Sequence, residues 1–251
     1  METTTLQKWG YAKQKFNKDE LILHFRPGTS DETIIKEVLQ RNVYQKKKIG
    51  FLIEPTDVWL DCGGNVGCFS LLVLSAGGTS VIVEPEPENL KMIEQNLEAN
   101  FPNQKGESYD IIPGAVDIEE KVKKFYLCRT DYNKSRHTLY EKKGWKHIEV
   151  QCHTLKSILE TYPEINAIKM DIEGSEIDIL EHYDFSNFQK IQKLVFEYSF
   201  DVDRSIPRFL NIVKRLEKCF KVVNFTKIDP NDSDKKTYDF YPPQTLVFCL
   251  R

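Results

Sequence analysis

Residues 58–74 read VWLDCGGNVGCFSLLVL and constrain the fold more than any other stretch of the chain. An apolar run that predicts a buried strand meets an aspartate and closely spaced glycines, and a helix-like apolar run follows. Glycine permits positive φ angles and leaves room for a ligand, because it has no Cβ. The stretch therefore predicts a strand, a tight turn at the carboxyl end of a sheet, and a helix whose first N–H groups are free.

The rest of the chain alternates in the same way between helical patterns and short apolar runs. A helix is predicted over residues 29–44, where Thr29 and Glu32 have capping-box spacing. Alternation over this length predicts an α/β fold with a mostly parallel sheet that helices cover on both faces. No helical pattern separates the last two strands, 220–225 and 245–250, so the sheet should be mixed, with an antiparallel edge strand. The whole chain, 1–251, is interpreted as a single domain, with an N-terminal helical segment (1–50) and an inserted β-hairpin (121–153).

Composition argues against several classes of protein. The formal net charge is -3, whereas a nucleic-acid-binding domain is usually basic. The six cysteines form no CxxC pair and no zinc-like cluster with histidine, which indicates a reduced, cytoplasmic protein. No run reaches the roughly 18 apolar residues that a membrane span needs. We therefore expect neither a nucleic-acid partner nor a membrane span.

The glycine turn allows two kinds of cofactor. A dinucleotide fingerprint G-x-G-x-x-G requires glycine where the chain has Cys62, and a pyrophosphate disfavours the neighbouring carboxylate of Asp61. The cationic end of S-adenosylmethionine tolerates that carboxylate. Glu84, at the end of the next strand, is at the usual position of an acid that binds a ribose diol. Both cofactors contain a ribose, so Glu84 does not distinguish between them. The turn therefore favours S-adenosylmethionine over NAD. A third interpretation, a turn that binds no ligand, would not explain the presence of Asp61 and Glu84.

A second acidic cluster occurs in IKMDIEGSEIDIL, residues 168–180. Asp171 ends a predicted strand, so its carboxylate should face the same crevice as the glycine turn. Lys169 is unusual in a core and is predicted to pair with one of the acids. Glu176 lies in a first helical turn, where the helix dipole favours a negative charge. Three acids are able to hold Mg2+, but nothing in their spacing requires it, and we predict no metal.

Three motifs of the chain resemble those of the FkbM family of S-adenosylmethionine-dependent methyltransferases. The family's D-x-G-x-N-x-G turn is matched by DCGGNVG, its E-P by residues 84–85, and its K-x-D-x-E-G-x-E by KMDIEGSE. The similarity extends over roughly residues 29–197. The resemblance implies a Rossmann-like class I methyltransferase fold with seven main strands, and O-methylation of a sugar or secondary-metabolite hydroxyl.

The crevice is assigned to the cofactor on one side and to the acceptor on the other. The cofactor residues are expected to be Asp61, Gly63, Gly64, Asn65, Gly67, Glu84, Pro85, Ala115, Val116 and Asp171. The acceptor is expected to meet Tyr132, Arg136, His137, Glu173 and Glu197, with the polar stretch 229–243 and its Tyr238 and Tyr241 nearby. Side chains that form hydrogen bonds with hydroxyls, together with aromatic rings, suit a sugar or glycan, whereas a polyketide needs a more aliphatic pocket.

A hydroxyl nucleophile must lose its proton, which requires a base within hydrogen-bond reach. Asp171 is the first candidate, because the strand end places it in the crevice, and His137 on the hairpin is the second. Glu173 is also assigned to catalysis. The alternatives are methylation of a small secondary metabolite, ribose 2′-O-methylation of RNA, and a binding module without catalysis.

Overall fold

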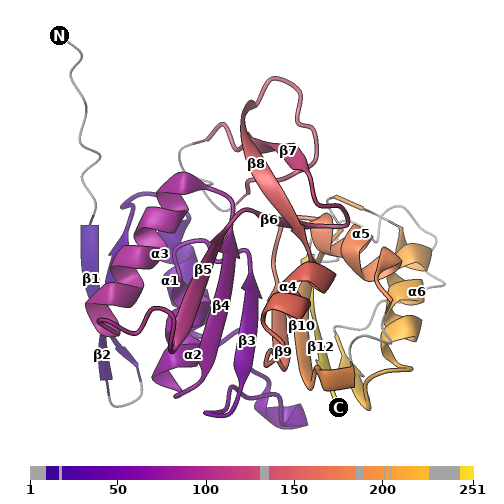
Figure 1. The fold of residues 1–251 in the computed structure, drawn as a ribbon, viewed down its shortest axis with the longest axis horizontal. Helices are drawn as coiled ribbons and strands as arrows, with labels where there is room; N and C mark the ends of the chain where they lie inside the picture. Colours follow the sequence, from indigo (N-terminus) through magenta and orange to yellow (C-terminus); the bar gives the residue numbers. More distant parts are fainter. Residues whose placement is uncertain are drawn as a thin grey trace.

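The computed structural model describes residues 10–16, 19–130, 136–184, 189–200, 202–203, 205–225 and 244–251. Its centre is a seven-stranded sheet with the order β11-β12-β10-β9-β3-β4-β5 (Figure 1). The strand order reverses between β3 and β9: the strands that follow β3 in the chain extend the sheet on one side, and those that follow β9 extend it on the other. The strands are β3 (Val58–Cys62), β4 (Thr79–Glu84), β5 (Tyr109–Pro113), β9 (Ala167–Met170), β10 (Lys193–Ser199), β11 (Val222–Asn224) and β12 (Gln244–Leu250).

The sheet is parallel except at β12. That strand runs antiparallel to β10 and to β11 on its other side. The predicted α/β fold with a mostly parallel sheet, mixed at one edge, is therefore confirmed. The antiparallel strand lies one place in from the edge, and β11 forms the edge itself.

Helices cover both faces of this sheet because successive strand residues point to opposite sides. Trp59 packs on one face with residues from the helices α1 (Asp31–Ile35), η1 (Lys36–Gln40), α2 (Cys68–Ser75) and α3 (Pro87–Asn100). Leu60 packs on the other face with residues from α4 (Leu155–Thr161), α5 (Ser175–His182) and α6 (Ile206–Leu216). Two apolar cores, one on each face, fix the strand ends that carry the site.

The hairpin predicted between β5 and α4 is present above the carboxyl ends of the strands (Figure 1). Its arms β7 (Val122–Leu127) and β8 (Lys146–Thr154) pair antiparallel, and β6 (Ala115–Asp117) pairs parallel with β8. The small sheet β6-β8-β7 has its own core around Phe125 and Cys152.

The N-terminal segment, expected to be helical over 1–50, begins instead with strands in its described part. β1 (Gly10–Phe16) and β2 (Asp19–Phe25) form an antiparallel pair. Leu21 and Leu23 are buried, so the segment has the two-residue period of a strand. The helix predicted over 29–44 is shorter than expected: α1 continues into the π-helical turn η1, and a 3-10 turn, η2 (Lys47–Ile49), follows.

Candidate active site

The glycine turn after β3 is shaped by its neighbours in the sheet. Gly63, Asn65 and Gly67 all have positive φ angles. A Cβ on Gly63 would stand 2.1 Å from the carbonyl oxygen of Asp171, and one on Gly64 would stand 2.4 Å from a methyl carbon of Ile82. Glycine is therefore required at both positions, because Gly63 packs against the segment that follows β9 and Gly64 packs against β4 itself, whether or not a ligand is bound.

Glu84 ends β4 with its carboxylate buried against this turn. The backbone N–H groups of Asn65 and Glu86 donate to it at 2.8 and 2.9 Å, and the side-chain amide of Asn89 donates at 3.1 Å. Burial raises the pKa of Glu84 to about 7, against the opposing effect of these donors. The three bonds leave acceptor capacity on the carboxylate, because two carboxylate oxygens offer about four acceptor positions.

Asn89 connects Glu84 to the N-terminal segment. Its side-chain oxygen accepts a 2.8 Å hydrogen bond from the buried Arg26 guanidinium, which also forms a two-bond ion pair with Asp31. Sequence reasoning missed Arg26 and Asn89. Arg26 lies in no recognised motif, and Asn89 lies in the stretch IVEPEPENL, residues 82–90, which resembles the family, but it was not assigned a role.

A first cavity, with about 500 Å3 of empty space of which part is open to solvent, lies between this turn and the hairpin. One wall is apolar and is formed by Val83, Pro85, Ala115, Val116, Phe125 and Leu139. The polar groups are Asn65, Glu84, Asn89, His137, Asp171 and Glu173. The side-chain oxygen of Asn65 is buried and has no hydrogen-bond partner. A cavity that is lined by both apolar side chains and acceptor oxygens fits a nucleoside with a free amino group or hydroxyls, as S-adenosylmethionine has.

Asp61 is not part of this wall. It is fully buried, and it accepts hydrogen bonds from Lys169 at 3.0 Å and from Ser70 at 2.8 Å. Asp61 therefore does not face the cofactor as predicted, because its buried carboxylate forms an ion pair with Lys169 of the neighbouring strand. Lys169 also was predicted to pair within the second acidic cluster and instead pairs with Asp61. Burial opposes its charge, yet the carboxylates of Asp61 and Asp171 raise the pKa of Lys169 above its usual value.

Asp171 stands between the first cavity and a second, larger one of about 1920 Å3, part of which is open to solvent. Its Oδ2 accepts a 2.6 Å hydrogen bond from the hydroxyl of Tyr44. The Tyr44 ring packs edge-on against Phe69 and lies 5.5 Å from the Lys169 ammonium. Sequence reasoning missed Tyr44, because the irregular segment after η1 carries no motif.

The second cavity combines charge with apolar surface. Its charged groups include Glu37, Lys46, Arg136, Lys169, Glu173 and Glu197. Its apolar groups are Ile34, Val38, Val43, Phe69, Leu246 and Phe248. Burial, together with the Asp171, Glu173 and Glu176 carboxylates, raises the pKa of Glu197 to about 10. Burial and the neighbouring carboxylates therefore favour the protonated form of Glu197.

The loop after β9 separates the roles of the remaining acids. Glu173 has a φ of 56° and lines both cavities. Glu176 is fully buried, and its Oε2 accepts from the N–H of Gly174 at 2.9 Å. Burial raises the pKa of Glu176 to about 8. The structure thus places Glu173 at the site and Glu176 beneath it, at the start of α5.

His137 is buried and lines the first cavity. Its Nδ1 accepts a 2.8 Å hydrogen bond from the backbone N–H of Cys128. A neutral imidazole with an acceptor at Nδ1 carries its proton on Nε2. Both nitrogens are then occupied, so His137 is unsuited to the role of general base that the sequence suggested. Its position toward the first cavity also separates it from Arg136, which lines the second.

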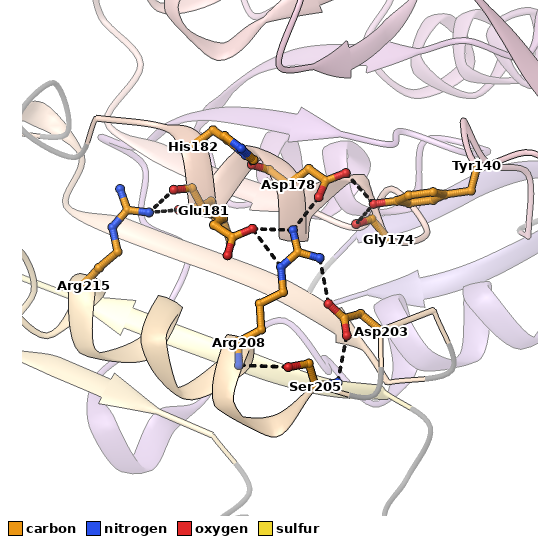
Figure 2. Close-up of polar contacts among 10 residues, drawn as sticks. Tyr140, Gly174, Asp178, Glu181, His182, Asp203, Ser205, Arg208 and Arg215 are labelled. Atoms are coloured by element: carbon orange, nitrogen blue, oxygen red, sulfur yellow. Dashed lines mark hydrogen bonds and ion pairs between the residues drawn. The ribbon is translucent and has the colours of Figure 1, made fainter.

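The hairpin region is fastened to the loop after β9. The hydroxyl of Thr138 donates to the Glu173 carbonyl at 3.1 Å, and the Tyr140 hydroxyl donates to Asp178 at 2.7 Å. Figure 2 shows how Arg208 of α6 continues this network, with Asp178, Glu181 and Asp203 around its guanidinium. Of the predicted acceptor residues, Tyr132, Tyr238, Tyr241 and the stretch 229–243 lie outside the described residues.

Within the described residues, the aspartate, glutamate, histidine and cysteine side chains form no group of three or more that could hold a metal ion. The helices of the same residues are all too short or too polar to cross a lipid bilayer. The six cysteines of the chain are free thiols.

The strand order and the two cavities over the strand ends at the switch point define a class I methyltransferase. A family model described as the methyltransferase FkbM domain matches residues 61–222, more than half of the chain. The chain belongs to the FkbM family of S-adenosylmethionine-dependent methyltransferases, which confirms the predicted family, fold and cofactor.

Individual relatives are distant. Methyltransferase 1 of Beauveria bassiana (strain ARSEF 2860) is 23% identical over 203 residues, which cover 71% of this chain and 78% of that protein. The crystal structure of a methyltransferase FkbM from Methylobacillus flagellatus KT is 14% identical with a TM-score of 0.46, over 82% of this chain and 49% of that one. The chain thus spans about half the length of that structure. M. capricolum TrmK with S-adenosylhomocysteine is 11% identical with a TM-score of 0.43, over 82% and 66% of the two chains.

Proposed function

We propose that the protein is an O-methyltransferase that transfers the methyl group of S-adenosylmethionine to a hydroxyl of a sugar or glycan. The observation that supports this most is the position of Asp171, which lines both cavities and therefore stands between a cofactor in the first and an acceptor in the second. The second cavity offers carboxyl groups for hydroxyls and the aromatic rings of Tyr44, Phe69 and Phe248 for a sugar face.

The chain's residues have distinct parts in this proposal. Glu84 and Asn65 hold the polar groups of the nucleoside and amino-acid portions of the cofactor, and Val83, Pro85 and Val116 pack against its base. When bound, S-adenosylmethionine supplies a methyl group on a sulfonium sulfur, which retains the carbon–sulfur electron pair on transfer. Asp171 accepts the hydroxyl proton, with one carboxylate oxygen fixed by Tyr44. Positioning of the hydroxyl contributes much of the rate.

A small secondary metabolite is the second candidate acceptor, and one observation favours it. The expectation of a sugar rested on loops that are poor in aliphatic residues. The second cavity also receives Ile34, Val38, Val43 and Leu246 from the N-terminal segment and β12. An aliphatic wall suits an acceptor that carries an apolar portion beside its hydroxyl.

The experiment that tests the proposal has two parts. Isothermal titration with S-adenosylmethionine, S-adenosylhomocysteine and NAD tests the cofactor, and binding of the first two alone is expected. Incubation with labelled cofactor and a panel of deoxysugar glycans, hydroxylated small metabolites and RNA tests the acceptor, with the methyl located by mass spectrometry. If the Asp171→Asn variant methylates the acceptor at the wild-type rate, Asp171 is not the base and Glu173 becomes the candidate. Cofactor binding without transfer to any acceptor would favour a binding module.

A further inference from the structure

Two carboxyl groups stand side by side at the acceptor end of the site. In the parallel pairing of β9 with β10, the last registered pair is Met170 with Phe196. Asp171 comes directly after the end of β9, Glu197 follows Phe196 within β10, and both line the second cavity. Neighbouring strands lie about 4.8 Å apart, so the two carboxyl groups are within reach of two adjacent oxygen atoms of one ligand.

The two groups are in different environments. Asp171 accepts the hydrogen bond from Tyr44. Glu197 interacts electrostatically with the Asp171 carboxylate, and Glu173, Glu176, Lys169 and Tyr44 are the other titratable groups that interact with the pair. Two carboxylates so close together cannot both be ionised without a large cost. The pair therefore offers one acceptor, Asp171, and one donor, the protonated carboxyl of Glu197.

We propose that Asp171 and Glu197 together recognise an acceptor with two oxygens on adjacent carbons. The hydroxyl that is methylated donates its proton to Asp171, and the neighbouring oxygen accepts a hydrogen bond from Glu197. The substrate class is thus a vicinal diol, or a hydroxyl beside an ether or carbonyl oxygen. This inference rests on the proposed O-methyl transfer and narrows its acceptor.

The inference is tested first by acceptor choice. The probes are cis-1,2-cyclohexanediol, cis-1,3-cyclohexanediol, whose oxygens are not on adjacent carbons, and cyclohexanol, which is a single alcohol. We expect kcat/KM to be about tenfold higher or more for the 1,2-diol than for the other two probes, because a buried donor without a partner is costly. Equal rates for diol and single alcohol overturn this inference alone. No transfer to any of these probes contradicts the proposed hydroxyl methylation, and this inference with it.

Three variants identify the residue that is responsible. Glu197→Gln keeps a donor and should retain the preference for the diol, whereas Glu197→Leu should abolish it. Glu37→Leu is the matched control, since Glu37 lines the same cavity from η1, and it should leave the diol-to-alcohol ratio unchanged. A ratio that Glu197→Leu does not change, or that Glu37→Leu lowers equally, overturns the assignment.

A measurement without turnover separates the two proposals further. Carbon-13 NMR of labelled side-chain carboxyl groups, assigned with Glu197→Gln, should show Glu197 protonated at neutral pH in the protein alone. Its titration midpoint should fall in Asp171→Asn, because the neighbouring negative charge is removed. An ionised Glu197 at neutral pH, or a midpoint that ignores Asp171, overturns the donor role even if hydroxyl methylation is found.

Discussion

The hydroxyl of Tyr44 donates a 2.6 Å hydrogen bond to Oδ2 of Asp171, across 127 positions of sequence. The bond brings the N-terminal segment into the site, because Tyr44 follows η1 and Asp171 follows β9. Burial and the Asp171 carboxylate raise the pKa of Tyr44 well above its usual value, so the hydroxyl keeps its proton and acts as a donor. Tyr44 is thus a positioning residue for the proposed base.

Tyr44→Phe should lower kcat about tenfold, because a hydrogen bond to a charged group contributes roughly 1.5–3 kcal/mol, only part of which is specific to the transition state. The KM for the acceptor should change much less than kcat, because the Tyr44 hydroxyl contacts the base and not the acceptor. Cofactor affinity should stay within about twofold.

Tyr162→Phe is the matched control for this substitution. Its hydroxyl also donates at 2.6 Å to an aspartate, Asp110, which lines neither cavity. Steady-state kinetics should show wild-type kcat and KM for Tyr162→Phe. An equal fall of kcat in both variants, or a change in Tyr44→Phe that is confined to KM, would contradict the positioning role.

Glu84 gives a prediction for cofactor binding. Burial raises its pKa to about 7, so its carboxylate gains a proton and loses an acceptor position as the pH falls through this value. Affinity for S-adenosylhomocysteine in the wild type should therefore weaken on going from about pH 8 to about pH 6. Glu84→Gln should bind about tenfold more weakly at the higher pH, with a flatter dependence.

Isothermal titration measures both effects, with Glu86→Gln as the control. Glu86 caps α3 through a 2.6 Å bond to the N–H of Asn89 and does not line the first cavity. Glutamine keeps the capping oxygen, so affinity should be retained. Wild-type affinity in Glu84→Gln would remove Glu84 from the cofactor site.

The sequence predicted correctly those parts of the structure that are determined by residues close together in the chain. The strand, turn and helix of residues 58–74 are local in this sense, and so is Glu84 at the end of β4. The partner of Asp61 was not predictable, because Lys169 reaches it from a strand 108 positions away. The tautomer of His137 likewise depends on one backbone N–H, that of Cys128. β2 was missed because the capping signal that follows it suggested a helical segment.

Glu176 gives a prediction for stability. Burial raises its pKa from 4.5 to about 8, so the folded state holds a proton that the unfolded state releases above pH 4.5. The stabilising contribution of this protonation is complete below the unfolded pKa and is lost as the pH rises through the folded pKa. Wild-type stability should therefore fall relative to Glu176→Gln by up to about 1.4 kcal/mol per pH unit across this window.

Urea unfolding at several pH values measures that difference. Glu176→Gln should match the wild type near the acid end of the window and exceed it near the alkaline end. Glu160→Gln, at a side chain that is 67% exposed, should follow the wild type throughout. Parallel curves for Glu176→Gln and the wild type would show that Glu176 is already ionised in the folded state.

The Arg208 network provides the last prediction. The Arg208 side chain is 26% exposed, and its guanidinium contacts Asp178 at 2.6 Å, Glu181 at 2.5 Å and Asp203 at 2.7 Å, which joins α6 to α5 and to the turn after β10 (Figure 2). Arg208→Met keeps much of the aliphatic stem but leaves three carboxylates without their cation. Because charge-assisted bonds in a partly buried site are at stake, we expect a loss of about 1–3 kcal/mol of unfolding free energy.

Thermal unfolding measures this loss, which corresponds to a fall in Tm of about 2–10 °C for a chain of this length. The fall should be smaller at high salt, since screening reduces the repulsion among the carboxylates. Lys156→Met is the control, because its ion pair with Glu160 spans 3.9 Å between side chains that are 71% and 67% exposed, and it should change stability by less than about 0.5 kcal/mol. Addition of Asp203→Asn to Arg208→Met should restore part of the loss, because one of the unpaired charges is removed. If Arg208→Met and Lys156→Met unfold at the same temperature, the network does not hold α6 in place.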